Sequence, residues 1–204
     1  MKVKICGITR GEDAKAAADL GAEYLGFIFI QASRRTIAPE DAARLIRQLP
    51  STVTPVGVFM NATREEVLYT LKVTGIRTIQ LHGRETPEEA EGYPVPVWKA
   101  FGVDAAFRPE MLDRYRVSAF LLDNLSGGNI GGTGKPFDWS LALGAKRCGD
   151  IVLAGGITPE NVQRAVETVR PFAIDVNSGV ELSPGRKDHA KLRRLFESVR
   201  MQNH

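Results

Sequence analysis

Cysteine and long apolar segments are scarce in this sequence. Cys6 and Cys148 are the only cysteines among its 204 residues, which excludes the disulfide framework of small secreted domains. No stretch approaches the ~20 apolar residues that cross a bilayer, and the first residues contain no apolar segment of signal-peptide length. We therefore expect a cytoplasmic protein that does not enter a membrane.

Clustered positive charge is lacking as well. The net charge is +3, but Lys and Arg are dispersed and never form a run of five, which argues against a nucleic-acid partner. His82 has no companion at metal-ligand spacing, since the other histidines, His189 and His204, lie near the far end of the chain. We expect no metal site.

What the sequence does contain is the composition of an ordinary globular domain. Hydrophobic residues make up 43% and charged residues 25% of the chain. No Pro-, Gly- or Ser-rich linker divides it, so we predict one domain over residues 1–204. This length is near the lower limit for a closed eight-unit barrel.

Eight short apolar runs, rich in Val, Ile, Leu and Phe, recur at intervals of roughly 20 to 25 residues with amphipathic stretches between them. This pattern is typical of repeated βα units. Eight parallel strands are the number that closes a (β/α)8 TIM barrel with helices outside, and an open doubly wound sheet is the alternative. The predicted strands are 3–6, 24–29, 55–60, 77–81, 95–101, 118–123, 150–155 and 171–176.

Capping residues and early acidic side chains indicate where helices begin. The clearest signals are Pro39 before Glu40 and Asp41, Thr63 before Glu65 and Glu66, and Thr158 before Pro159 and Glu160. The segment 86–93, after the fourth strand, leaves room for a truncated helix only.

In such a barrel the chemistry lies at the carboxyl ends of the strands. Cys6 ends the first strand before Gly7, where a thiolate facing the barrel mouth can take a proton from carbon. Asp123 closes the apolar sixth strand, where partial desolvation favours the protonated form that a general acid needs. We predict this pair as catalytic; an inert buried cysteine and a loop-capping aspartate are the structural alternatives.

Glycine-rich segments follow the last three predicted strands, at 127–135, 154–156 and 177–179. Backbone N–H groups beside a helix start make an anion site, so three such segments together favour a phosphate over simple turns. The segment 124–136 also has the length and glycine content of a lid, from which Lys135 can offer a charge. The candidate binding residues in these segments are Gly132, Gly155, Gly156, Ser178 and Gly179.

Three further residues are candidates for binding the rest of a substrate. Arg35, in a basic loop after the second strand, can hold a carboxylate or phosphate through two hydrogen bonds, whereas Arg34 fits a solvated surface. His82 can donate to an anionic or hydroxyl group. Asp175 can bind a sugar hydroxyl or support the neighbouring loop. For His82 and for Asp175, a purely structural role is the alternative.

The sequence motifs at the strand ends also resemble, in order, those of a known protein family. They are KICGIT at 4–9, GFIF at 26–29, SRRTI at 33–37, VGVF at 56–59, QLHG at 80–83, LLD at 121–123, GGTGKPFDW at 131–139, LAGGI at 153–157, DVNSGVE at 175–181 and PGRKDH at 184–189. Together, and in this order, they resemble the phosphoribosylanthranilate isomerase family of tryptophan biosynthesis over the whole chain.

The resemblance implies an Amadori rearrangement of phosphoribosylanthranilate to 1-(2-carboxyphenylamino)-1-deoxyribulose 5-phosphate, without a cofactor or metal. It implies that Asp123 protonates the ribose ring oxygen and that Cys6 removes the proton at C2. Arg35 would hold the anthranilate carboxylate, and N–H groups after the last two strands would hold the phosphate. The expected partner is one small phosphorylated substrate, and we expect a monomer or a homodimer.

Two alternatives stay open at this point. A phosphoribosyl isomerase of histidine biosynthesis performs the same chemistry on a larger substrate with two phosphates. Such enzymes usually use two aspartates, and a second glycine-rich segment near strands two to four is missing here. A non-catalytic phosphosugar-binding barrel is the other alternative, but phosphate binding requires neither Cys6 nor Asp123.

Overall fold

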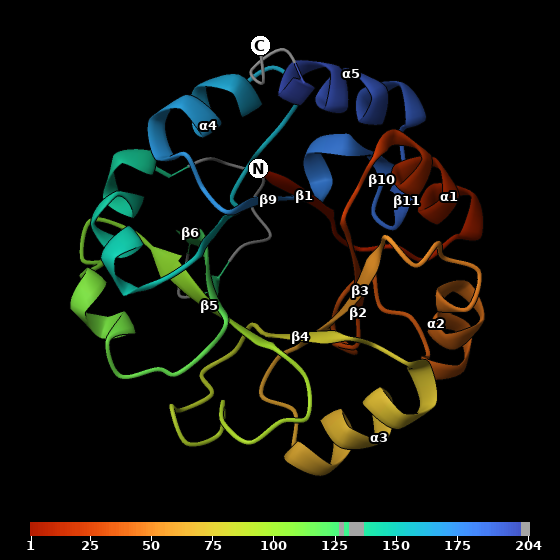
Figure 1. Ribbon diagram of the computed structural model, residues 1–204, viewed down its shortest axis with the longest axis horizontal. Coiled ribbons are helices and arrows are strands. Elements are labelled where there is room, and N and C mark those ends of the chain that lie inside the picture. The colour runs from red at the N-terminus through yellow and green to blue at the C-terminus, as the bar shows by residue number, and fades with distance from the viewer. Residues whose placement is uncertain (127–128, 131–136, 201–204) are drawn as a thin grey trace.

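Eight parallel strands close into a barrel in the computed structural model, which describes residues 1–126, 129–130 and 137–200. Each strand pairs with its neighbour around the ring, and the pairings of β5 with β6 and of β9 with β1 close it. Figure 1 shows this ring from one end. The predicted TIM barrel is thus confirmed, and the open sheet is wrong. The barrel strands are β1 (Lys2–Ile5), β2 (Tyr24–Ile28), β3 (Thr54–Phe59), β4 (Thr78–Leu81), β5 (Val97–Val103), β6 (Ala119–Ser126), β8 (Ile151–Leu153) and β9 (Ala173–Val176).

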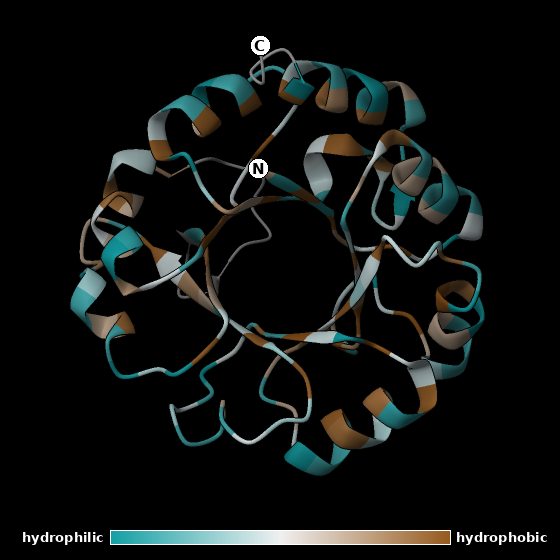
Figure 2. Cartoon of the chain, viewed as in Figure 1, coloured by the Kyte–Doolittle hydropathy of each residue, from teal (hydrophilic) through white to brown (hydrophobic). Residues whose placement is uncertain are grey.

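Helices surround the barrel and turn their apolar faces toward the strands, as the colouring in Figure 2 shows. In α4, for example, Val162, Ala165 and Val169 are buried. The helices are α1 (Gly11–Leu20), α2 (Pro39–Ile46), α3 (Arg64–Thr74), α4 (Val162–Val169) and α5 (His189–Arg200), with 3₁₀ helices η1 (Pro109–Leu112), η2 (Trp139–Ala142), η3 (Gly144–Cys148) and η4 (Ser178–Val180). Among the described residues, no helix has the length and apolar character needed to cross a membrane.

Alternate residues of each strand serve two different layers. In β6, Phe120 and Leu122 belong to the apolar layer under the helices, whereas Leu121 packs inside the barrel and Asp123 lines its mouth. Ile5 and Cys6 divide in the same way at the end of β1. The two-residue period of a strand therefore places a thiol and a carboxyl on the inside of one barrel.

Two of the three predicted helix starts are confirmed. α2 begins at Pro39, and α3 begins after Thr63, whose hydroxyl accepts a hydrogen bond from the Glu66 N–H while the Glu66 side chain accepts one from the Thr63 N–H. The start at Thr158 is wrong, because α4 begins only at Val162. The intervening turn is held by Asn161, which accepts from the Thr158 N–H at 2.8 Å.

The truncated helix predicted at 86–93 is a turn. Thr86 and Glu89 bond to each other's backbone N–H groups as a helix start would, at 3.3 and 2.8 Å. Gly92 then adopts a left-handed φ of 73° and ends the turn. The units after β5 and β6 contain 3₁₀ helices where α-helices were expected, so the described helical layer is thinner on this side of the barrel.

The sixth strand does not end at Asp123 as predicted. β6 continues to Ser126 because its last residues pair antiparallel with the short strand β7 (Asn129–Ile130). A second hairpin, formed by β10 (Glu181–Ser183) and β11 (Arg186–Lys187), follows η4 and was not predicted. Both hairpins rise from the end of the barrel that carries the polar strand-end residues.

Candidate active site

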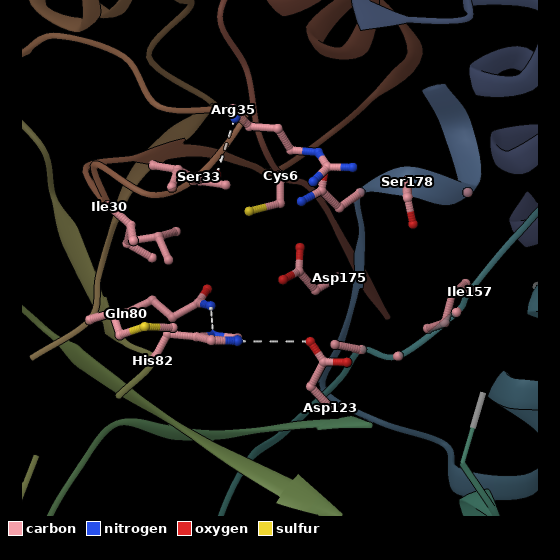
Figure 3. A pocket seen from close by; sticks show the side chains of 18 of the residues that line it. Cys6, Ile30, Ser33, Arg35, Gln80, His82, Asp123, Ile157, Asp175 and Ser178 are labelled. Carbon is pink, nitrogen blue, oxygen red and sulfur yellow. Dashed lines mark hydrogen bonds and ion pairs between the residues drawn. The ribbon is translucent and has the colours of Figure 1, made fainter. Parts of the chain in front are cut away.

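A cavity of about 300 Å³ opens at the carboxyl ends of the strands. Side chains from β2, β3, β4, β6 and β9 converge on it with Cys6, which follows β1, and with residues of the loops (Figure 3). Gly132, and Lys135 of the proposed lid, lie outside the described residues. The cavity brings together the other predicted site residues: Cys6, Arg35, His82, Asp123, Gly155, Gly156, Asp175, Ser178 and Gly179.

Cys6 is seated by two glycines. A Cβ at Gly26 would lie 2.7 Å from the Cys6 sulfur, so only glycine leaves room for the thiol. Gly7 has a left-handed φ of 73°, and a Cβ there would lie 2.8 Å from Asn177 Oδ1, so the chain can turn directly after the cysteine. Cys6 is buried, and this burial raises the pKa of its thiol although the Lys4 charge acts to lower it.

Asp123 faces the same cavity from the other side, on β6 (Figure 3). Burial raises the pKa of its carboxyl to about 6, although a hydrogen bond of 2.7 Å from the Asn124 N–H acts to lower it. The negative charge of Asp175 contributes to the rise. The carboxyl can therefore hold a proton at a pH where an ordinary aspartate has lost it.

His82 is directed toward Asp123 by Gln80. The Gln80 amide nitrogen lies 2.8 Å from His82 Nδ1 and leaves Nε2 on the other edge of the ring. That nitrogen lies 3.9 Å from Asp123 Oδ2. Gln80 itself is 1% exposed, and its Oε1 has no partner among the described residues, so an acceptor lies ready at the cavity wall.

Asp175 is divided between two tasks. Its Oδ2 accepts a hydrogen bond of 2.8 Å from the fully buried Lys4 ammonium. Its Oδ1 is buried without a partner in the described part of the chain. Because buried acceptors are nearly always satisfied, this oxygen is suited to receive a hydroxyl donor from a ligand in the cavity.

Arg35 is oriented by a carboxylate. Its Nε and Nη2 donate to Glu181 at 2.7 to 3.1 Å, which leaves Nη1 on the opposite edge of the guanidinium. Glu181 also accepts from Lys187 Nζ at 3.0 Å and from the Gly185 N–H at 3.1 Å. Burial acts to raise the pKa of Glu181, but Arg35 and Lys187 hold it below its ordinary value. The hairpin β10–β11 thus holds the arginine at the rim.

The loops after β8 and β9 expose backbone to the cavity. Gly155 and Gly156 have left-handed φ values of 80° and 65°, and a Cβ at Gly179 would lie 2.0 Å from a backbone oxygen. The carbonyl of Gly156 accepts from Asn161 Nδ2 at 2.8 Å. Since the N–H and C=O of a peptide plane point in opposite directions, this bond leaves the following N–H on the other side of the loop.

Five residues that position this site were not predicted: Lys4, Gln80, Asn161, Glu181 and Lys187. Lys4 and Gln80 each lie on a strand two residues before a predicted site residue, which directly follows the end of that strand, so the period of two gives a signal for both. Glu181 and Lys187 lie in a hairpin that the apolar pattern does not reveal. Their contacts span from 4 to 174 residues of sequence, and the sequence spacing gives no signal for the longer ones.

Comparison with known proteins gives one consistent result. The profile of the family described as N-(5'phosphoribosyl)anthranilate (PRA) isomerase matches residues 3–198. An N-(5'-phosphoribosyl)anthranilate isomerase of Citrifermentans bemidjiense is 51% identical over 199 residues, which cover 98% of this chain and 97% of the relative.

Solved structures agree with this. The phosphoribosyl anthranilate isomerase from Thermus thermophilus superposes with a TM-score of 0.92 at 43% identity, covering 99% of this chain and 100% of the other. A phosphoribosyl anthranilate isomerase in complex with reduced 1-(o-carboxyphenylamino)-1-deoxyribulose 5-phosphate has a TM-score of 0.85 at 39% identity, covering 98% and 99%.

The raised pKa of Asp123 has a consequence for stability. A carboxyl whose pKa is higher in the folded than in the unfolded chain is destabilising when ionised; the cost is absent below about pH 4 and complete above about pH 6. We expect Asp123→Asn to increase the free energy of unfolding by up to about 3 kcal/mol above pH 7, and by much less near pH 4.

Urea unfolding at the two pH values measures this difference. Asp138→Asn is the control, because the Asp138 carboxyl is exposed and hydrogen bonds from Ser140 hold its pKa below the ordinary value, so its removal should not stabilise the protein at pH 7.5. Equal or lower stability of Asp123→Asn at pH 7.5 would show that the Asp123 carboxylate is not desolvated.

Proposed function

The chain belongs to the N-(5'-phosphoribosyl)anthranilate isomerase family, and we propose that Cys6 and Asp123 perform the proton transfers of this isomerisation. It is an isomerase of tryptophan biosynthesis that converts phosphoribosylanthranilate to 1-(2-carboxyphenylamino)-1-deoxyribulose 5-phosphate. One observation carries the assignment of roles: a thiol and a desolvated carboxyl face the same cavity from β1 and β6.

Asp123 acts first, as general acid. Its raised pKa keeps a usable proton, which it gives to the ring oxygen of the ribose as the bond from C1 to that oxygen breaks. The lone pair of the anthranilate nitrogen forms the C1=N bond of a protonated Schiff base. The ring is then open, and Asp123 is left as a carboxylate next to the His82 ring.

Cys6 acts second, as general base. Its thiolate takes the proton from C2, which the adjacent protonated C=N bond has made acidic. The electrons of the C2–H bond form a C1=C2 double bond, and those of the C=N bond return to nitrogen. The enolamine that results becomes the ketone when the C2 hydroxyl loses its proton and C1 gains one.

The remaining cavity residues hold the substrate. Arg35 Nη1, on the edge not used by Glu181, binds the anthranilate carboxylate. Asp175 Oδ1 accepts a sugar hydroxyl, and His82 donates to an oxygen of the substrate. Backbone N–H groups of the two glycine loops hold the phosphate through Gly155, Gly156, Ser178 and Gly179; Gly132 is proposed from the sequence alone.

The setting of the enzyme is part of the proposal. The ligand is a small phosphorylated molecule, and we propose that residues 1–204 act as one catalytic domain. A cytoplasmic location and a monomer or homodimer are the forms we expect. Sedimentation analysis of the purified chain distinguishes the two assembly states.

Loss of either proton-transfer group should abolish most of the activity. We expect Cys6→Ala and Asp123→Ala each to lower kcat by on the order of 10² to 10⁴ with the fold intact. The decay of the fluorescence of the anthranilate substrate measures turnover. Cys148→Ala is the matched control, because that cysteine lies outside the cavity. Near wild-type turnover in either cavity variant would refute the assignment, and no turnover by the wild type would favour a non-catalytic barrel.

The pH profile of kcat/KM should be bell-shaped with its two flanks far apart. Activity needs Asp123 protonated and Cys6 ionised, yet the pKa of Asp123 is about 6 and that of Cys6 lies above its ordinary 9.0. Between these values both the protonation of Asp123 and the ionisation of Cys6 change tenfold per pH unit in opposite senses. The active form therefore stays constant at about one molecule in 10³ or fewer.

We thus expect kcat/KM to rise up to about pH 6, to remain level, and to fall only above pH 9. The phosphate of the substrate also titrates near pH 6, so the profile is repeated with Asp123→Glu. An acid flank that stays in place in this variant belongs to the substrate and removes the assignment to Asp123. A flank on the alkaline side below pH 8 would contradict a buried thiol as the base.

Arg35 should act on affinity. We expect Arg35→Ala to raise KM by roughly 10- to 100-fold, the effect of losing a charge-assisted hydrogen bond to a carboxylate, with a smaller change in kcat. Arg34→Ala is the neighbouring control, since Arg34 is exposed and does not line the cavity. Steady-state kinetics of the two variants give the comparison, and equal KM values would exclude the role of Arg35.

A further inference from the structure

A fully buried lysine lies next to the thiol of the active site. Lys4 has no exposed surface, and it precedes Cys6 by two residues on β1, so both side chains point into the barrel. Its register partner on β9 is Asp175, whose Oδ2 lies 2.8 Å from the ammonium. The ion pair and the thiol thus occupy adjacent layers of one barrel interior.

Stability alone does not account for this ion pair. Removing an ammonium and a carboxylate from water is costly, and buried ion pairs can often be replaced by apolar side chains of similar size without loss of stability. Several other interior positions of the barrel are apolar, among them Ala100, Leu121 and Val152. A charge at position 4 therefore points to a role in the chemistry above it.

Lys4 is in reach of the sulfur. A Cβ placed on Gly26 would lie 2.7 Å from Cys6 Sγ and 3.2 Å from Lys4 Cε, so the thiol and the end of the lysine side chain share the space that this glycine leaves. An ammonium has three N–H donors, and the bond to Asp175 uses one of them. The others are available to an anion that forms on the sulfur.

We propose that Lys4 is a positioning residue of the isomerisation, whose buried ammonium, anchored by Asp175, supplies the counter-charge for the thiolate of Cys6. The proposal rests on the role of Cys6 as general base. It assigns to Lys4 the function of making a desolvated thiol ionisable without placing a cation in the space that the substrate occupies.

Other charged or titratable groups also lie around Cys6, and none of them supplies the thiol with as much positive charge as Lys4 does. Lys187 from β11 and Arg35 from the loop after β2 both bind Glu181, which offsets their charge. Asp175 from β9 opposes ionisation, and Asp123 and His82 lie across the cavity. Among these groups the Lys4 charge lowers the pKa of the thiol most.

The test uses the opposite charges of Lys4 and Asp175, which should shift the ionisation of Cys6 in opposite directions. We expect Lys4→Met and Lys4→Gln to raise the midpoint of Cys6 ionisation by about one pH unit or more, because a cation next to the sulfur is lost. Asp175→Asn should lower it, because an anion is lost. Both kinds of variant break the same ion pair, so structural damage alone would move the midpoint in one common direction.

The midpoint is measured as the rate of alkylation of Cys6 by iodoacetamide against pH, with a Cys148→Ser background so that one thiol reacts. Circular dichroism and thermal unfolding establish that each variant is folded. If Lys4→Met does not fold, the more polar Lys4→Gln takes its place. An unchanged midpoint in a folded Lys4 variant, or equal shifts for Lys4 and Asp175 variants, overturns the proposal.

Turnover provides the second readout. We expect the level part of the kcat/KM profile to fall about tenfold for each pH unit by which the thiol midpoint rises. The alkylation rate reports the ionisation of the Cys6 thiol and requires no turnover, whereas near wild-type turnover in Cys6→Ala would show that Cys6 is not the base. Failure of this inference is therefore distinguishable from failure of the proposed function.

Discussion

Desolvation of ionisable groups at the barrel mouth is the constraint on which the site depends. The strands bring apolar side chains up to the layer of Cys6 and Asp123, and the same burial raises the pKa of both groups. It also requires each buried cation to be held by a carboxylate, which explains the pairs of Lys4 with Asp175 and of Lys187 with Glu181. The chemistry and the ionic network are thus two results of one physical condition.

The barrel converts local sequence rules into this arrangement. Parallel strands end on the same side, so polar residues that follow separate apolar runs meet at one mouth, and the two-residue period selects which of them face inward. The loop after β8 contributes backbone groups to the cavity through its conformation. Gly155 and Gly156 are left-handed, and the carbonyl of Gly156 is tied back by Asn161. Local backbone conformation and strand direction together build a polar cavity on an apolar core.

The parts of this structure that could be predicted are those that depend on local pattern. Strand positions, the barrel and the polar strand ends follow from apolar periodicity, and the helix at Thr63 follows from its capping box. The β6–β7 hairpin was missed because it lies beyond the apolar run. Glu181 was missed because its bond to Arg35 joins residues 146 positions apart. Lys4 carries a local signal, but only its contacts with Asp175 and the space at Gly26 give it a meaning.

The same desolvated cavity has opposite effects on the acid and the base proposed for this site. The distribution of the cations around the two groups offsets this conflict. Burial helps the acid role proposed for Asp123, because it keeps the proton on the carboxyl, but it hinders the base role proposed for Cys6, because it opposes the thiolate. An equal supply of positive charge to both groups would help the thiol and weaken the acid. In the described structure Lys4 and Lys187 act on Cys6, whereas the effect of Lys4 on Asp123 is the smallest of the causes acting on that carboxyl. Because Lys4 and Lys187 act on the thiol, whereas Lys4 acts only weakly on the carboxyl, the pKa values of the two groups can be tuned separately within one cavity.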